Sequence, residues 1–149
     1  MEIQDFKKLL LNVAVCAISC DGHIDDLEIK ELHLINDKSP YFSQTNLVDS
    51  LNNSIGIAID SYKIFQESVL SKLNNNRLSV PQELSILEIS MTLIAADNKL
   101  EDTEIMFINL LRRHLSIDDS TIIERFGEID YLEFNNSTKN EFNNLSETD

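Results

Sequence analysis

The sequence predicts an all-α protein, a compact bundle of about seven helices that contains two related helix-joint-helix units. Apolar residues recur at spacings of three and four along most of the 149 residues, which is the period of a helix with one buried face. No run of alternating apolar and polar residues lies between turn signals, so we expect no strand. The apolar content of 42% is enough for one hydrophobic core.

The first two helices have clear end and start signals. The first is expected over residues 2–20 and is followed by Asp21-Gly22. Glycine readily takes the left-handed conformation that ends a helix, so we expect the chain to turn there. The second helix begins after Asp25, whose side chain is expected to cap it, with Glu28 as the second member of a capping box.

Five further helical patterns follow. They are expected at residues 44–56, 60–73, 79–96, 103–115 and 118–134. Asp60 is the expected cap of the fourth helix, and Pro81 is acceptable in the first turn of the fifth. The fifth helix is almost entirely apolar at its C-terminal end, so we expect it at the centre of the bundle.

The chain divides into one domain and a tail. Residues 1–134 carry all the helical patterns, whereas residues 135–149 read N-N-S-T-K-N-E-F-N-N-L-S-E-T-D. This segment is polar and rich in Asn, so we expect it to be mobile. Phe142 and Leu145 are its isolated apolar residues, and a short turn carrying both could dock on the domain.

The charge of the chain limits the classes of partner. The formal net charge is −14. A surface this acidic repels nucleic-acid phosphates and anionic lipid headgroups, and it favours cations, basic proteins or simply solubility. No apolar run approaches the roughly 18 residues of a membrane span, and the N-terminus lacks the pattern of a signal peptide. We therefore expect a cytoplasmic protein with a protein partner, without nucleic-acid binding or membrane insertion.

The joint after the first helix occurs twice. Residues 17–29 read A-I-S-C-D-G-H-I-D-D-L-E-I, and residues 93–105 read L-I-A-A-D-N-K-L-E-D-T-E-I. The matched pairs are Asp21 with Asp97, Gly22 with Asn98, Asp25 with Glu101, Asp26 with Asp102, and Glu28 with Glu104. Asn is the best non-glycine residue for a left-handed backbone, so the replacement of Gly22 by Asn98 suggests a shared geometry.

This doubled pattern, with L-S-I-D-D-S-T-I before the last helix, resembles the TerB family, the tellurite-resistance TerB-like domain. The resemblance covers roughly residues 5 to 133. It implies a compact helical bundle without enzymatic activity, linked to tellurite resistance, chemical stress and phage defence. It also implies cation binding through the acidic joints. The chain departs from the family at Asn98, where glycine is usual, and in its Asn-rich tail.

The carboxylates of the joints are the candidate ligands of a divalent cation such as calcium, which takes hard oxygen ligands. They are Asp21, Asp25, Asp26 and Glu28 in the first joint, which is favoured, and Asp97, Glu101, Asp102 and Glu104 in the second. The spacing resembles the second half of an EF-hand loop, but Ala17 would stand at its first ligand position. Capping and turn formation account for the same acids, except Asp26 and Asp102.

No other chemistry is well supported. Cys16 and Cys20 lie one helical turn apart, as buried core residues of a reducing compartment would. A zinc site that combined them with Asp21 or His23 would lack a second cysteine pair. The chain has no nucleophile elbow, phosphate loop or metalloprotease motif, so we expect no catalytic residue and no organic cofactor.

These features leave three candidate functions. The first is a TerB-like stress or tellurite-resistance module that binds protein partners and a divalent cation. The second is an acidic immunity or inhibitor protein, which would neutralise a basic toxin or enzyme by presenting carboxylates to its cationic cleft. The third is a hydrolase with a carboxylate site, which no motif of the sequence supports.

Overall fold

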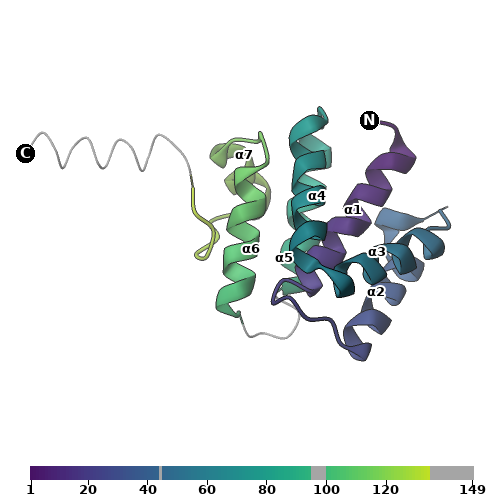
Figure 1. Cartoon of the computed structure of the whole chain (residues 1–149). Helices are drawn as coiled ribbons and strands as arrows, with labels where there is room; N and C mark the ends of the chain where they lie inside the picture. Colours follow the sequence, from purple (N-terminus) through teal and green to yellow (C-terminus); the bar gives the residue numbers. More distant parts are fainter. Residues whose placement is uncertain (44, 95–99, 135–149) are drawn as a thin grey trace, which may run out of the picture.

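The computed structural model describes residues 1–43, 45–94 and 100–134 of the chain. All regular structure in these residues is helical, which confirms the all-α class (Figure 1). The helices are α1 (Ile3–Ile18), α2 (Asp26–Lys38), α3 (Val48–Asp60), α4 (Tyr62–Asn75), α5 (Val80–Ile94), α6 (Asp102–Arg113) and α7 (Asp119–Phe126), and η1 is a short 3-10 helix (Pro40–Phe42). None of the described helices is long and apolar enough to cross a membrane.

Helix α1 lies at the centre of the bundle and contacts each helix from α2 to α6 (Figure 1). Its largest contact is with α5. The buried residues of α1 are Leu9, Leu10, Leu11, Val13, Ala14, Val15, Cys16 and Ala17. They surround the helix axis rather than forming one stripe, so this helix has to be covered on several sides. The central helix is therefore α1, whereas the sequence suggested α5.

Two predicted helix boundaries, the end of the third helix and the start of the fourth, are wrong because a single residue separates the two helices. The third helix starts at Val48 and ends at Asp60, so Asp60 is not the cap of the fourth. Ser61 stands between the two helices, with an extended backbone. A single residue between two helices leaves little sequence for turn signals, and the apolar period runs through it.

The last helix is shorter than predicted. It ends at Phe126 rather than near Phe134, because Gly127 takes a φ of +78° and turns the chain. The following segment runs back along α6, where the Asn109 amide donates to the Tyr131 carbonyl (2.9 Å) and accepts from the Glu133 N–H (2.7 Å). Leu132 is buried although it is not helical. The apolar residues after Gly127 therefore have the spacing of a helix, although no helix forms there.

Buried charged side chains fix the corner between α6 and α7. Arg112 donates to Asp119 at 2.8 Å, and both side chains are almost fully buried. Glu83 of α5 accepts from the backbone N–H groups of Ser116 (2.6 Å) and Ile117 (2.9 Å) in the connection between the two helices. Buried charges are tolerated when they are paired in this way, so the corner has one favoured geometry.

We expect Asp119→Ala to lower the free energy of unfolding by about 3–5 kcal/mol, because it leaves the Arg112 guanidinium buried without its partner. The matched control is Glu133→Ala, which removes the exposed partner of Arg113. That substitution should cost about 0–1 kcal/mol. Urea unfolding at neutral pH, followed by circular dichroism, measures both values. Equal losses in the two variants would contradict the structural role of the buried pair.

Candidate functional site

The first joint is held by hydrogen bonds from its own carboxylates. Asp21 Oδ1 accepts from the backbone N–H of His23 (2.9 Å), and Gly22 takes a φ of +84°. Asp25 Oδ1 accepts from the Glu28 N–H (2.8 Å), while Glu28 Oε1 accepts from the Asp25 N–H (3.0 Å). The predicted capping box and the predicted glycine turn are both confirmed. These carboxylates therefore satisfy backbone donors that the start of a helix leaves unpaired.

The environment of Glu28 opposes its charge. Partial burial is the largest effect and raises the pKa of its carboxyl, and the nearby Asp25 and Asp21 raise the pKa further. The hydrogen bond from the Asp25 backbone N–H acts in the opposite direction. Neighbouring carboxylates at a helix start would repel each other less if a cationic group faced them.

The described half of the second joint has the same form. Helix α6 begins at Asp102, the residue that matches Asp26 at the start of α2. The residues before these two helices have similar extended backbones, with φ and ψ of −97° and 173° at Asp25 and −81° and 154° at Glu101. Glu104 Oε1 accepts from the Glu101 N–H at 2.8 Å, as Glu28 does from Asp25. Asp97 and Asn98 lie outside the described residues.

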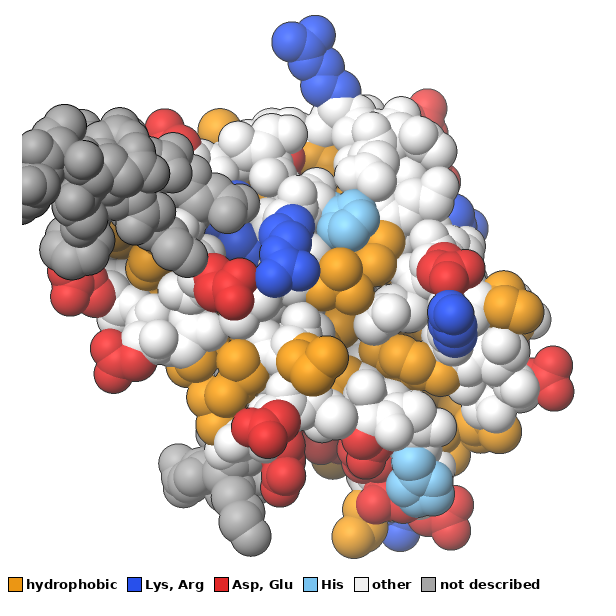
Figure 2. Space-filling model, turned by 60° about the vertical axis from the view of Figure 1, so that its left-hand side comes forward, with side chains coloured by type: hydrophobic (Ala, Val, Ile, Leu, Met, Phe, Trp, Pro, Cys, Tyr) orange, Lys and Arg blue, Asp and Glu red, His pale blue; other side chains and the backbone are white. Residues whose placement is uncertain are grey.

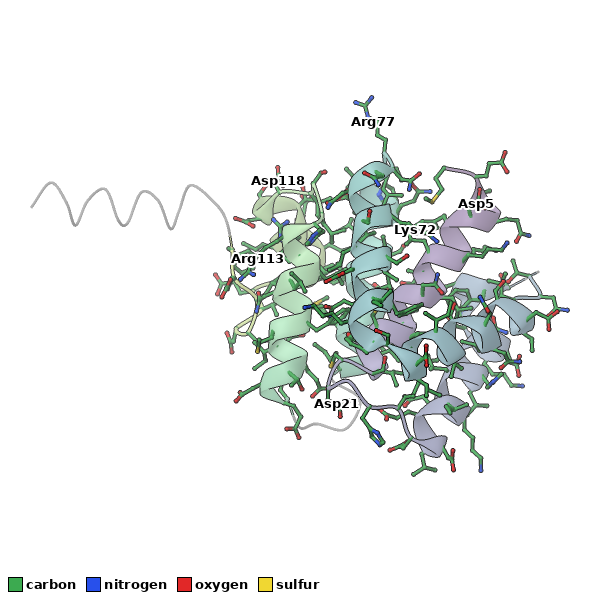
Figure 3. The ribbon with its side chains drawn as sticks, viewed as in Figure 1. Asp5, Asp21, Lys72, Arg77, Arg113 and Asp118 are labelled. Carbon is green, nitrogen blue, oxygen red and sulfur yellow. The ribbon has the colours of Figure 1, made fainter. Side chains whose placement is uncertain are left out.

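The two joints lie at the same end of the bundle. The thiol of Cys20, just before the first joint, contacts Thr103 and lies near the carboxylate of Glu104. Burial, followed by the charges of Glu104 and Asp21, raises the pKa of Cys20 to about 12. Figure 3 shows Asp21 at the lower end of the molecule, beside the start of α6. The beginning of the first joint thus lies beside the start of α6.

The carboxylates at this end are exposed, but they do not form a preformed metal site in the described part of the chain. Asp21, Asp25, Asp26, Glu101 and Asp102 are exposed, and Glu28 and Glu104 are half-buried. Among residues 1–43, 45–94 and 100–134, no three His, Cys, Asp or Glu side chains gather as metal ligands would. The hydrogen bonds of the caps also occupy oxygens that a cation would need. The cation stays a prediction.

The cysteines are poor candidates for zinc. Burial raises the pKa of Cys16, and its neighbour Cys20 raises it further. A zinc ligand must be a thiolate, which both surroundings disfavour. Cys16 is buried on α1, whereas His23 is exposed in the first joint. Their surroundings fit the core residues that the sequence also suggested.

A second polar cluster lies away from the joints. Tyr41 of η1 donates its hydroxyl to Glu88 of α5, and Arg125 of α7 pairs with the same carboxylate. Burial and then Glu88 raise the pKa of Tyr41 to about 12. The three side chains border a hollow of about 230 Å³. Because each charge or hydroxyl has a partner within the cluster, its clear effect is to tie η1 and α7 to α5.

A groove on the outer face of α6 was not predicted from the sequence. It has a volume of about 380 Å³ and starts beside the joints, at Cys20 and Thr103. Its further lining includes Gln66, Met106, Phe107, Leu110, Arg113 and Glu133. Figure 2 shows hydrophobic side chains gathered on the face that is turned forward there, with acidic side chains toward its lower end. We call this feature the α6 groove.

One signal could have revealed the groove. Met106 falls outside the buried stripe of α6, which includes Phe107, Ile108 and Leu111, and it is 71% exposed. A single exposed apolar residue is common, and it indicates a binding surface only where it borders further apolar surface. Helical periodicity indicates which face of α6 is buried and says little about its exposed face.

Comparison with known proteins adds no relative: no family model, no curated protein and no solved structure matches this chain.

The capping role of the joint predicts different effects for two substitutions at one position. Asp25→Ala should lower the free energy of unfolding by about 1 kcal/mol, because the Glu28 N–H loses its acceptor. Asp25→Asn should have almost no effect, because Asn caps a helix as well as Asp does. Thermal unfolding of both variants measures the difference. Equal destabilisation would mean that the charge, not the cap, is the important property of Asp25.

Asn substitutions also test the cation separately from the cap. If the first joint binds calcium, calcium chloride should raise the melting temperature more than magnesium chloride does at the same concentration, because a ligand that binds only the folded chain stabilises it. The calcium-specific rise should disappear in the Asp21→Asn/Asp25→Asn variant. Equal effects of the two salts would leave these carboxylates with their cap and turn bonds alone.

Proposed function

We propose that the chain is a non-enzymatic binding module of the TerB type, with a role in tellurite resistance or chemical stress, and that its acidic end binds a basic protein partner. One observation carries the proposal. Both copies of the joint start their second helix after a residue with an extended backbone and a capping box, and the beginning of the first joint lies beside the start of α6. Duplication of a helix-joint-helix unit is also the feature on which the family resemblance rests.

The geometry of the joints favours binding. The capping bonds hold Asp25 and Glu28 in fixed positions before a partner arrives, which reduces the entropy lost on association. Asp26 and Asp102 are the first residues of α2 and α6, and both are exposed. The matched carboxylates of the two copies are therefore open to solvent.

The charge of the whole chain favours a basic partner. A formal net charge of −14 attracts cationic surfaces over a distance of about 8 Å at physiological ionic strength. Carboxylates around a binding surface raise the association rate more than they raise the affinity. We therefore expect a complex whose formation slows as salt is added.

The state of the cysteines supports a function without catalysis. The nucleophilic form of a cysteine is the thiolate, which a lowered pKa favours at neutral pH. The surroundings of Cys16 and Cys20 instead raise both pKa values. The buried carboxylate of Glu83 is used to hold the connection between α6 and α7. The polar groups with unusual surroundings thus have structural roles.

A second candidate function is an immunity or inhibitor protein that neutralises a basic toxin or enzyme. The observation that favours it is the net charge together with the exposed carboxylates of Asp26, Glu101 and Asp102 at one end. The binding surface would be the same, but the partner would be a toxin or enzyme with a cationic cleft. A toxin gene next to the gene of this chain would favour this candidate.

Charge reversal at the joints tests the binding surface. We expect Asp26→Lys/Asp102→Lys to remove the partners that the immobilised chain retains from a lysate of its native host at low salt, because both substitutions place a cation on the proposed surface. Both side chains are exposed, so folding should be retained. Circular dichroism confirms the fold, and mass spectrometry identifies the retained proteins.

The matched control is Glu2→Lys/Asp5→Lys, which makes the same change of charge at exposed acids at the start of α1. Figure 3 shows Asp5 at the upper end of the molecule and Asp21 at the lower end. Retention of the same proteins by the control but not by the joint variant supports the proposed surface. If both variants lose them equally, binding depends on net charge alone and the proposed surface is wrong.

The biological role is tested in the native host. Deletion of the gene should lower the concentration of potassium tellurite that stops growth, and the parent gene should restore it. The Asp26→Lys/Asp102→Lys gene should fail to restore it, while the Glu2→Lys/Asp5→Lys gene should succeed. Unchanged tellurite tolerance after deletion would remove the resistance role and favour the immunity candidate.

A further inference from the structure

The α6 groove leaves apolar surface uncovered. Met106 is 71% exposed, and the half-buried Leu110 and the buried Phe107 line the same groove. The volume of about 380 Å³ lies within the range of roughly 300–1,000 Å³ that is usual for binding pockets. Methionine adapts its shape to what covers it, so this surface is suited to an apolar side chain.

The described chain ends at the border of this groove. Glu133 is one of the lining residues, and its backbone N–H donates to Asn109 of α6. Its carboxylate pairs with Arg113 at 3.0 Å. Phe134, the last described residue, is therefore placed directly beside the α6 groove, and the remaining fifteen residues, 135–149, start there.

We propose that residues 135–149 of this chain dock in the α6 groove, with the side chains of Phe142 and Leu145 covering Met106. These two are the large apolar residues of a segment that is otherwise polar. They are three positions apart, a spacing that places both on one face of a single helical turn.

The length of the segment fits this docking. Phe142 lies eight positions after Phe134, which allows a reach of about 26–29 Å when the chain is extended. Helix α6 has 12 residues and is about 18 Å long. Phe142 therefore reaches every part of the groove without full extension. Attachment to Phe134 also gives the segment an effective concentration in the millimolar range, which makes a small apolar contact sufficient.

Charge favours this occupant over a second copy of the chain. Each copy has a formal net charge of −14, so two copies repel each other as they approach. The segment, with one Lys against two Glu and one Asp, carries a much smaller charge and is already attached beside the groove, so its repulsion is smaller. Docking is independent of the identity of any partner, and a partner that uses the same groove would have to displace the segment.

A single fluorescent residue reports the docking. The chain contains no Trp, so Phe142→Trp creates one reporter inside the segment. In the full chain we expect emission at shorter wavelength than in a free peptide of residues 135–149 with the same substitution. Acrylamide is a neutral quencher that the acidic chain does not repel. Its quenching constant for the full chain should be at most half of its quenching constant for the peptide. Leu145→Trp should give the same result.

Substitutions on the groove and elsewhere identify the docking surface. Met106→Asp should return the emission and the quenching constant to the values of the peptide. The control, Leu34→Asp, changes a 58% exposed apolar residue on α2 and should leave both values unchanged. Circular dichroism melting establishes that all variants are folded.

Three outcomes would overturn the proposal. Equal emission wavelengths and quenching constants in both Trp variants and the peptide would mean that the segment does not dock. Protection that survives Met106→Asp would place the segment elsewhere on the molecule. Protection that increases with protein concentration would mean that the segment docks on a second copy.

Discussion

The burial of α1 is the constraint on which the rest of the structure depends. Its apolar residues face in several directions, so no single partner helix can cover them. Several helices have to pack around it, among them α6, which presents one apolar face with Phe107, Ile108 and Leu111. Covering α1 fixes where these helices lie. It also places the starts of α2 and α6 at the same end of the bundle.

Much of this arrangement could be predicted from the sequence, and the misses have physical causes. Gly22 was identified because the apolar period stops at it, and Asp25 because its capping partner lies three residues later. Gly127 was missed because Ile129 and Leu132 continue the helical spacing beyond it. Those residues reach the core in a segment held by Asn109, and a hydrogen bond across 22 to 24 residues leaves no local signal.

The candidate site was predicted only in part. The caps of the first joint follow from sequence spacing, because a capping box is local. The proximity of Cys20 to Thr103 and Glu104 depends on how distant helices pack, although the repeat suggested that the two joints are related. The α6 groove needs Gln66 and Glu133 beside α6, which only the tertiary structure shows. The same carboxylates can cap a helix and face a ligand, so residue type alone does not separate these roles.

The separation of α1 from its main partner along the chain has a consequence for synthesis. Helix α1 leaves the ribosome before α5, which begins only at Val80. At about 5–20 residues per second, the apolar sides of α1 wait several seconds before α5 can cover them. During that time the side of α1 that α5 later covers is exposed apolar surface of the nascent chain, to which a chaperone can bind.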